Sequence, residues 1–189
     1  EKNVVQAEID FIKAMGVEFK TGVEVGKDVT IDDLRKQGYE AFYVAIGAQG
    51  GRKLGVPNED AKGVLSGVDF LRGVNLGSEP KLHGKVVLMG GGNVAIDVAR
   101  TAKRWGVYSV ILYCLESRDI MTAAKDEIAE AEGEGITINN SWGVKEFVKN
   151  PDGSLKSVVL KKCTAVFDKD HKFNPTYDEA NLQEVPCDY

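Results

Sequence analysis

Three consecutive glycines between an expected strand and an expected helix constrain the fold of this chain most. Lys85–Met89 is an unbroken apolar run after its first residue, Gly90-Gly91-Gly92-Asn93 follows it, and a helical pattern runs from about Val94 to Trp105. An apolar run of this kind predicts a strand buried on both faces, as in a parallel sheet. Glycine costs about 1 kcal/mol within a helix, and three in a row at a helix entrance indicate a functional cause, so we interpret the junction as a ligand site. The alternative is a glycine-rich turn that binds nothing.

Further elements alternate in type after this junction. A strand is expected over Tyr108–Cys114, a helix over Ala123–Glu134 and a strand over Ile136–Asn139. Strands that alternate with helices predict a parallel sheet with helices packed on it. Within the helix that follows the glycines, Asp97 and Arg100 lie one turn apart, which favours an ion pair between them.

The pattern then changes to antiparallel strands. Val144–Lys149 and Ser154–Lys162 flank Asn150-Pro151-Asp152-Gly153, where proline and glycine suit the central positions of a turn. Together with Glu184-Val185-Pro186 these strands predict a meander laid over the sheet, and polar Asp168–Asn181 is expected to be an exposed loop. The predicted fold class is α/β, with a helix-flanked parallel sheet and an antiparallel β-meander, in three layers.

The N-terminal third predicts a separate set of elements. We expect a helix over residues 3–15 ended by Gly16, short strands over 17–20 and 22–25, and a helix that begins after Thr30, with Asp33 completing a capping box. The apolar run 41–46, ended by Gly47, predicts another buried strand. Residues 48–80 are rich in glycine and predict a connection, with a helical turn or more near 68–71.

The glycine motif has the spacing of a dinucleotide fingerprint, Gly90-x-Gly92-x-x-Ala95. Gly90 permits a tight turn, Gly92 lets the backbone approach a diphosphate, and Ala95 is small enough for the helix to pack on the strand. Asn93 and Val94 supply backbone N–H groups at a helix N-terminus, which attracts phosphate. Gly91 completes the loop.

A second candidate segment, Glu116-Ser117-Arg118, follows the second strand. Glu116 lies 21 residues after Ala95, close to the spacing expected for the acidic residue that meets the adenosine ribose. A carboxylate accepts hydrogen bonds from the ribose hydroxyls and favours NAD, whereas arginine binds a 2′-phosphate and favours NADP. Because both residue types are present, the cofactor is predicted only as NADP or NAD.

Composition excludes several functions. The net charge of −5 argues against a nucleic-acid binder, and no apolar run is long enough for a membrane span. The N-terminus lacks the apolar core of a signal peptide. Three widely spaced cysteines, Cys114, Cys163 and Cys187, match neither a disulfide framework nor a metal site, which favours a cytoplasmic protein with reduced thiols. His83 and His171 each stand alone, so we expect no metal and no catalytic side chain.

The segment Val86–Arg100 resembles the NADPH-binding segment of the glutamate synthase small (beta) subunit and its relatives, which include dihydropyrimidine dehydrogenase and flavin-based ferredoxin–NADP oxidoreductases. The resemblance continues upstream over 16–19, 29–30, 44–49, 55–57 and 67–71. It implies a Rossmann-like FAD/NAD(P)-binding fold, in which an FAD-binding fold is interrupted by an NAD(P)H-binding fold, with Ile46 and Gly47 near the flavin. Many members carry a basic pair where this chain has Leu115 and Glu116, which lowers the expectation of NADPH and raises that of NADH.

The resemblance also implies a domain division and a function. Residues 1–62 are expected to be part of an FAD-binding domain, 63–84 a linker and 85–189 the NAD(P)H-binding domain. Family members pass hydride from NAD(P)H to FAD, and the electrons go on to iron–sulfur clusters. The partner is then an iron–sulfur electron-transfer domain or a chain like the glutamate synthase large subunit.

Two further expectations accompany this function. No glycine fingerprint precedes residue 47, so the sequence is expected to be a central fragment, inactive alone, with FAD bound in the complete protein. The alternative function is a non-catalytic dinucleotide-binding or sensing module that has kept the fold.

Overall fold

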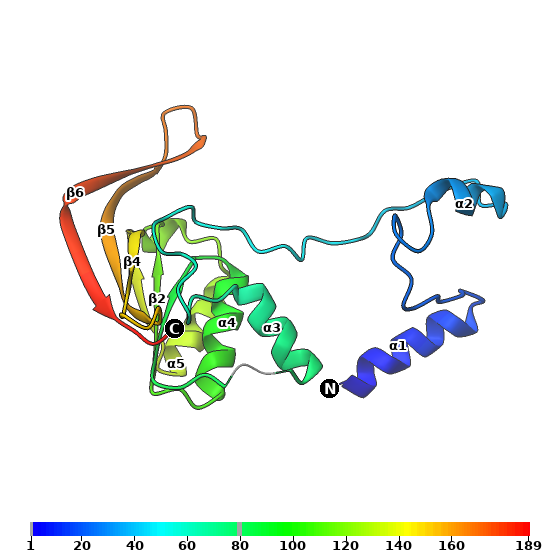
Figure 1. Cartoon of the computed structure of the whole chain (residues 1–189), viewed down its shortest axis with the longest axis horizontal. Helices are drawn as coiled ribbons and strands as arrows, with labels where there is room; N and C mark the ends of the chain where they lie inside the picture. Colours follow the sequence, from blue (N-terminus) through cyan, green and yellow to red (C-terminus); the bar gives the residue numbers. More distant parts are fainter. Residues whose placement is uncertain (1, 79–80) are drawn as a thin grey trace. The chain divides into compact units, whose positions relative to one another are not determined.

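The computed structural model describes residues 2–78 and 81–189, and its contacts divide the chain into two units, Glu1–Gly47 and Ala48–Tyr189. Figure 1 labels helices of both units and strands of the second unit. Ala61 and Phe70 are buried in the core of the second unit, so residues of the segment 48–84 pack with that unit. The functional boundaries at residues 62 and 84 stay predictions.

The first unit contains the two predicted helices, α1 (Lys2–Ala14) and α2 (Ile31–Lys36). Gly16 ends the first helical segment at φ +92°, a left-handed conformation that glycine adopts without strain. The Thr30 hydroxyl accepts a hydrogen bond from the Asp33 amide, while the Asp33 carboxylate accepts one from the Thr30 amide. The predicted capping box is therefore confirmed.

The strands predicted in the first unit do not form. Residues 17–20 and 41–47 have irregular backbone, and Val25 makes only an isolated bridge with Val29. A buried strand needs neighbours that take its hydrogen bonds and cover both faces, and no described residue of this unit does so for 41–46. Tyr43 is consequently 94% exposed and Ile46 82% exposed.

A parallel sheet forms the centre of the second unit. Its strands are β1 (Lys85–Met89), β2 (Ser109–Cys114) and β3 (Thr137–Asn140), in the order β1-β2-β3. Backbone hydrogen bonds also join the C-terminal residues to the free edge of β1: Val87 donates to Tyr189 and Asp188 donates to Lys85, each at 2.9 Å. Because β1 and β2 run parallel, their carboxyl ends lie side by side, which brings the glycine loop and the segment Glu116-Ser117-Arg118 together.

Helices cover one face of this sheet. They are α3 (Gly67–Leu76), α4 (Asn93–Arg104) and α5 (Lys125–Gly133), and a short 3-10 turn, η1 (Arg118–Ile120), precedes α5. Alternate residues of the strands, such as Val110 and Leu112, pack against buried side chains of α4 and α5, such as Ile96 and Ala131. This apolar contact orients α4, and with it the glycine loop at its N-terminus.

The opposite face of the parallel sheet packs on an antiparallel sheet, so the predicted three-layer α/β fold is confirmed. Its strands are β4 (Trp142–Lys149), β5 (Leu155–Phe167) and β6 (Phe173–Pro186), in the order β4-β5-β6. Tyr113 of β2 is buried there with Phe147 and Leu160.

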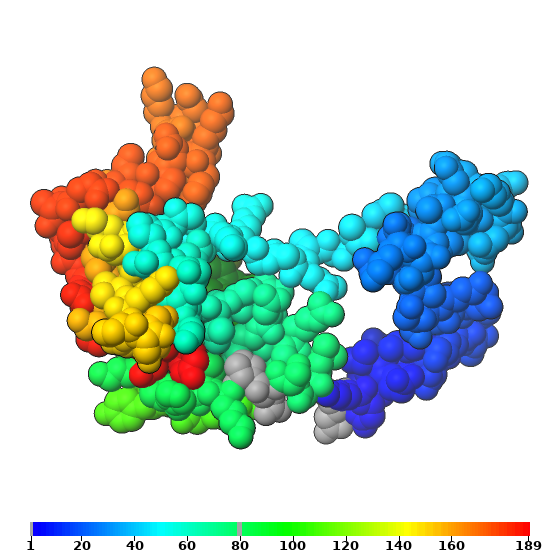
Figure 2. Space-filling model, viewed as in Figure 1, coloured from blue at the N-terminus to red at the C-terminus, as the bar shows by residue number. Residues whose placement is uncertain are grey.

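The predicted exposed loop 168–181 is wrong over most of its length, because β6 begins at Phe173. Backbone pairing with β5 satisfies this polar segment although its side chains remain solvated, as is common for an edge strand. Figure 2 shows the far end of the β5–β6 hairpin, in orange, projecting beyond the rest of the second unit.

The expected ion pair between Asp97 and Arg100 is replaced by contacts between helices. Arg100 donates to Glu134 at 2.8 Å and pairs with Glu130 at 2.7 Å, and Arg104 also donates to Glu134, at 2.6 Å. Glu130 lies within α5 and Glu134 is the residue that caps its C-terminus, so these ion pairs tie α4 to α5. Helical spacing relates residues three or four positions apart, so it cannot predict ion pairs between residues that are 30 positions or more apart.

None of the helices formed by residues 2–78 and 81–189 combines the length and the apolar character needed to span a bilayer.

Candidate functional site

The glycine loop leaves the carboxyl end of β1 and turns directly into α4. The Gly90 amide donates to the Tyr113 carbonyl at 2.9 Å, which holds the start of the loop on β2. Gly90 has φ +143°, and a Cβ atom at this position would lie 3.2 Å from the Ala95 Cβ. The absence of a side chain at Gly90 and the small one at Ala95 therefore allow helix and strand to approach closely, as their spacing predicts.

The second glycine packs against the end of β2. A Cβ atom on Gly91 would lie 2.6 Å from Glu116 Oε2 and 3.0 Å from the Cys114 Cβ. The Gly91 carbonyl accepts a hydrogen bond from the Ala123 amide at 3.1 Å. Gly91 is thus required for packing within the protein, while its backbone fixes the chain that enters α5.

The third glycine is the N-cap of α4 and has open space beside it. Gly92 has an extended conformation, with φ −96° and ψ 173°, and the nearest atom to its built Cβ is Thr122 Oγ1 at 3.5 Å. As a glycine it has no side chain that could cap the helix. A ligand can therefore approach the backbone here.

Backbone amides at this helix entrance are available to an anion. Among the described residues, no acceptor is found for the N–H groups of Gly92, Asn93 and Val94. The aligned peptide dipoles of α4 add about half a positive charge at the same place. Unpaired amides together with this dipole suit phosphate oxygens.

The Asn93 side chain has a role that the sequence motif does not predict. Its Oδ1 accepts a hydrogen bond from the Ala124 amide at 2.8 Å. Ala124 is the N-cap of α5 and has no side chain able to cap, so a residue of α4 caps α5 instead. This bond sets the two helix N-termini side by side.

Glu116 lies at the carboxyl end of β2, beside the loop. Its carbonyl accepts hydrogen bonds from Asn140 Nδ2 and from the Ser141 amide, each at 3.1 Å, so one side chain and one backbone amide at the end of β3 hold the residue in place. Its half-buried carboxylate faces Gly91 and has no hydrogen-bond or ion-pair partner among the described residues. The carboxylate can therefore accept hydrogen bonds from a ligand.

The buried thiol next to this carboxylate is not reactive at neutral pH. Burial, with the negative charge of Glu116 nearby, raises the pKa of Cys114 to about 11. The thiol stays protonated, and only a thiolate is a nucleophile. Cys163 and Cys187 are also buried and unpaired.

The predicted site residues Ser117 and Arg118 engage other protein groups. Ser117 precedes η1 and its hydroxyl hydrogen bond lowers the pKa of the Asp119 carboxyl. Arg118 forms a two-point pair with Glu132 of α5, Nη1 to Oε1 at 2.9 Å and Nη2 to Oε2 at 2.7 Å. Sequence reasoning missed Glu132, because its 14-residue separation from Arg118 exceeds any local pattern.

One further acceptor lies in the first turn of α5. The Glu127 Oε2 atom is buried and has no hydrogen-bond partner among the described residues. A buried oxygen without a partner is costly, so this carboxylate lowers the stability of the fold. No pattern in the sequence distinguishes Glu127 from the other acidic residues of this helix.

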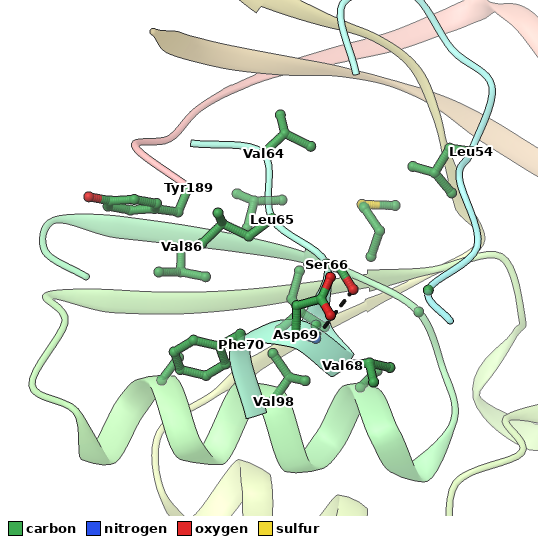
Figure 3. Close-up of a pocket in the computed structure, with 18 of the residues that line it drawn as sticks. Leu54, Val64, Leu65, Ser66, Val68, Asp69, Phe70, Val86, Val98 and Tyr189 are labelled. Atoms are coloured by element: carbon green, nitrogen blue, oxygen red, sulfur yellow. Dashed lines mark hydrogen bonds between the residues drawn. The ribbon is translucent and has the colours of Figure 1, made fainter. Parts of the chain in front are cut away.

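A cavity of about 650 Å³ adjoins the loop on the β1 side. It is lined by the segments 51–54 and 63–70, by β1, by the loop residues Gly90 and Gly92, and by one side of α4 from Val94 to Ala102. Figure 3 shows apolar side chains around it, among them Phe70, Val86 and Val98, and the Ser66 hydroxyl that accepts from the Asp69 amide at the start of α3. The loop therefore has the acidic Glu116 on one side and a mostly apolar cavity on the other.

Ile46 and Gly47 belong to the first unit, where Ile46 is exposed and Gly47 has φ +69°. Their predicted role toward a flavin stays a prediction. In the described residues, no group of three or more histidine, cysteine, aspartate or glutamate side chains is arranged to hold a metal ion.

A helix-flanked parallel sheet with a glycine loop between its first strand and helix is the fold of the dinucleotide-binding α/β proteins. The model of the family described as pyridine nucleotide-disulphide oxidoreductase matches residues 2–173. The chain belongs to this family.

Two relatives illustrate the similarity. The chain is 40% identical over 153 residues to the NADP(+)-dependent formate dehydrogenase subunit beta of Moorella thermoacetica, covering 79% of this chain and 20% of that protein. It is 34% identical over 171 residues to the glutamate synthase [NADPH] small chain of Escherichia coli, covering 85% and 36%. The chain thus spans only a fifth to about a third of the length of these relatives.

A solved structure supports the fold. Mycobacterium tuberculosis FprA in complex with NADPH superimposes with a TM-score of 0.72 at 19% identity, covering 88% of this chain and 52% of that one. At this identity the match establishes the fold and not the ligand.

Proposed function

We propose that the second unit binds the pyridine dinucleotide NADH or NADPH at the glycine loop. The unpaired amides of Gly92, Asn93 and Val94, beside the free carboxylate of Glu116, carry this proposal. These groups fit two adjacent parts of one ligand, because amides at a helix N-terminus suit its diphosphate and a carboxylate suits the hydroxyls of its adenosine ribose. The cavity on the β1 side leaves room for the half of the ligand beyond the diphosphate.

The protein would then take part in electron transfer within a longer flavoprotein. The bound nucleotide supplies a hydride and FAD accepts it, while the chain binds and orients the donor. Residues 1–62 would form part of the FAD-binding domain, with Ile46 and Gly47 near the flavin. The family match over residues 2–173 and the names of the two relatives support this role.

The electrons would pass from FAD to iron–sulfur clusters. We propose as partner either an iron–sulfur electron-transfer domain or a chain like the glutamate synthase large subunit. The relatives are named as subunits or small chains of larger enzymes, which supports a partner chain. The 189 residues alone would bind the nucleotide without completing the redox reaction.

Titration calorimetry with NADH and NADPH on the 189-residue chain tests the proposal. At least one nucleotide should bind, and Gly92→Val should abolish binding, because a branched side chain would occupy the space at the helix entrance. Gly92 has an extended backbone and no close neighbour, so this variant should keep its fold, as circular dichroism can verify.

Gly50→Val is the matched control, since Gly50 likewise has room for a side chain, with no atom within 4 Å of its built Cβ. It should bind like the unchanged chain. Equal affinity of the Gly92→Val variant would show that the ligand lies elsewhere. In the longer protein, a yellow colour that bleaches on nucleotide addition would separate the redox function from a sensing role.

A further inference from the structure

We propose that Glu132 is a specificity-determining residue that makes this site prefer NADH to NADPH. The inference rests on the proposed function and deepens it by naming the form of the nucleotide. The two forms differ at the adenosine ribose, which carries a free 2′-hydroxyl in NADH and a 2′-phosphate in NADPH.

Arg118 is the one basic side chain of the Glu116-Ser117-Arg118 segment. A 2′-phosphate is bound best by a guanidinium that offers two parallel N–H groups. Both terminal nitrogens of Arg118 already make this arrangement with the Glu132 carboxylate, at 2.9 and 2.7 Å. A phosphate must therefore compete with an internal carboxylate for the two N–H groups at the end of the guanidinium.

The neighbouring charges act in the same direction. The Glu116 carboxylate is half-buried against Gly91 without a partner, and Asp119 adds a third negative group in η1. Glu116, Asp119 and Glu132 outnumber the single positive charge of Arg118. A 2′-phosphate brought to this segment meets repulsion that a hydroxyl does not, and the hydroxyl can donate a hydrogen bond to Glu116.

Glu132 belongs to a different element of the fold from Glu116 and Arg118, the residues proposed to lie at the ribose. It projects from α5, whereas Glu116 and Arg118 follow β2. Its side chain is 44% exposed and that of Arg118 is 49% exposed, so the pair is open to a ligand and contributes little to folding. Changing Glu132 can thus alter the nucleotide preference without unfolding the unit.

The test is titration calorimetry of NADH and NADPH with the 189-residue chain and its variants. The unchanged chain should bind NADH more tightly. Glu132→Gln should shift the affinity ratio toward NADPH by about tenfold, equivalent to about 1.4 kcal/mol, through tighter NADPH binding. Glu132→Ala, which cannot bond to Arg118, should shift the ratio at least as far. Adding Arg118→Gln to the Glu132→Gln variant should remove the gain.

Glu130→Gln is the matched control, because it removes the same charge from α5 and breaks a pair with a different arginine, Arg100. Its affinity ratio should equal that of the unchanged chain. Tighter NADPH binding by the unchanged chain, or an unaltered ratio in both Glu132 variants, overturns this inference and leaves the dinucleotide site standing. Absence of binding by either nucleotide overturns the proposed function as well.

Discussion

Gly91→Ala should destabilise the second unit by about 1–3 kcal/mol, the usual cost of overpacking a closely packed position. The added methyl group would lie 2.6 Å from Glu116 Oε2 and 3.0 Å from the Cys114 Cβ. The carboxylate can swing away at small cost because it ends a flexible side chain. The Cys114 Cβ belongs to a buried central strand, so the loop or β2 must shift instead.

Urea unfolding followed by tryptophan fluorescence measures this effect, since Trp105 and Trp142 both lie in the second unit. With an unfolding slope of ~2 kcal/mol/M, the expected loss lowers the midpoint by about 0.5–1.5 M. Gly92→Ala is the control, because its methyl group has no neighbour closer than 3.5 Å. Its stability should change by less than about 1 kcal/mol. Removing the carboxylate as well, in Gly91→Ala/Glu116→Ala, should recover only part of the loss.

Equal midpoints for the Gly91→Ala and Gly92→Ala variants would show that the loop does not pack on β2 as described. The contact that fixes the orientation of the loop amides would then be absent.

Two further predictions concern the core and the charges between helices. Leu112→Ala removes a fully buried side chain from the central strand and should cost about 2–5 kcal/mol, seen as a lower urea midpoint with an unchanged slope. Glu134→Gln should lower the unfolding temperature by about 2–4 °C at neutral pH. The Arg104 guanidinium, with Arg100, holds the pKa of Glu134 below its usual value of 4.5, so the stabilisation is present above that pH. The difference in unfolding temperature should shrink as the pH falls below 4.5, and a constant difference from pH 7 to pH 3 would contradict this origin.

Local chemistry made part of the fold predictable. The capping box of Thr30 and Asp33 and the glycine turn between β1 and α4 involve residues within a few positions of each other. The apolar run of β1 and the helical pattern of α4 also report burial directly, because a strand or helix must hide its apolar face wherever it packs.

The errors came from segments whose partners are distant in sequence. Residues 41–46 have the composition of a buried strand but lack neighbours that could pair with them among the described residues of their unit. Residues 173–181 have the composition of a loop but form a strand, because β5 supplies the hydrogen bonds.

The glycine loop, its helix and the acidic residue after β2 could be predicted from the sequence alone, because each depends on short spacing and backbone conformation. What those groups contact follows from the packing of the fold: Asn93 caps α5, Gly91 packs on Cys114 and Arg118 is paired with Glu132. The physical reason is that a side chain's charge and shape are local properties, whereas its partner is set by how the helices and strands pack.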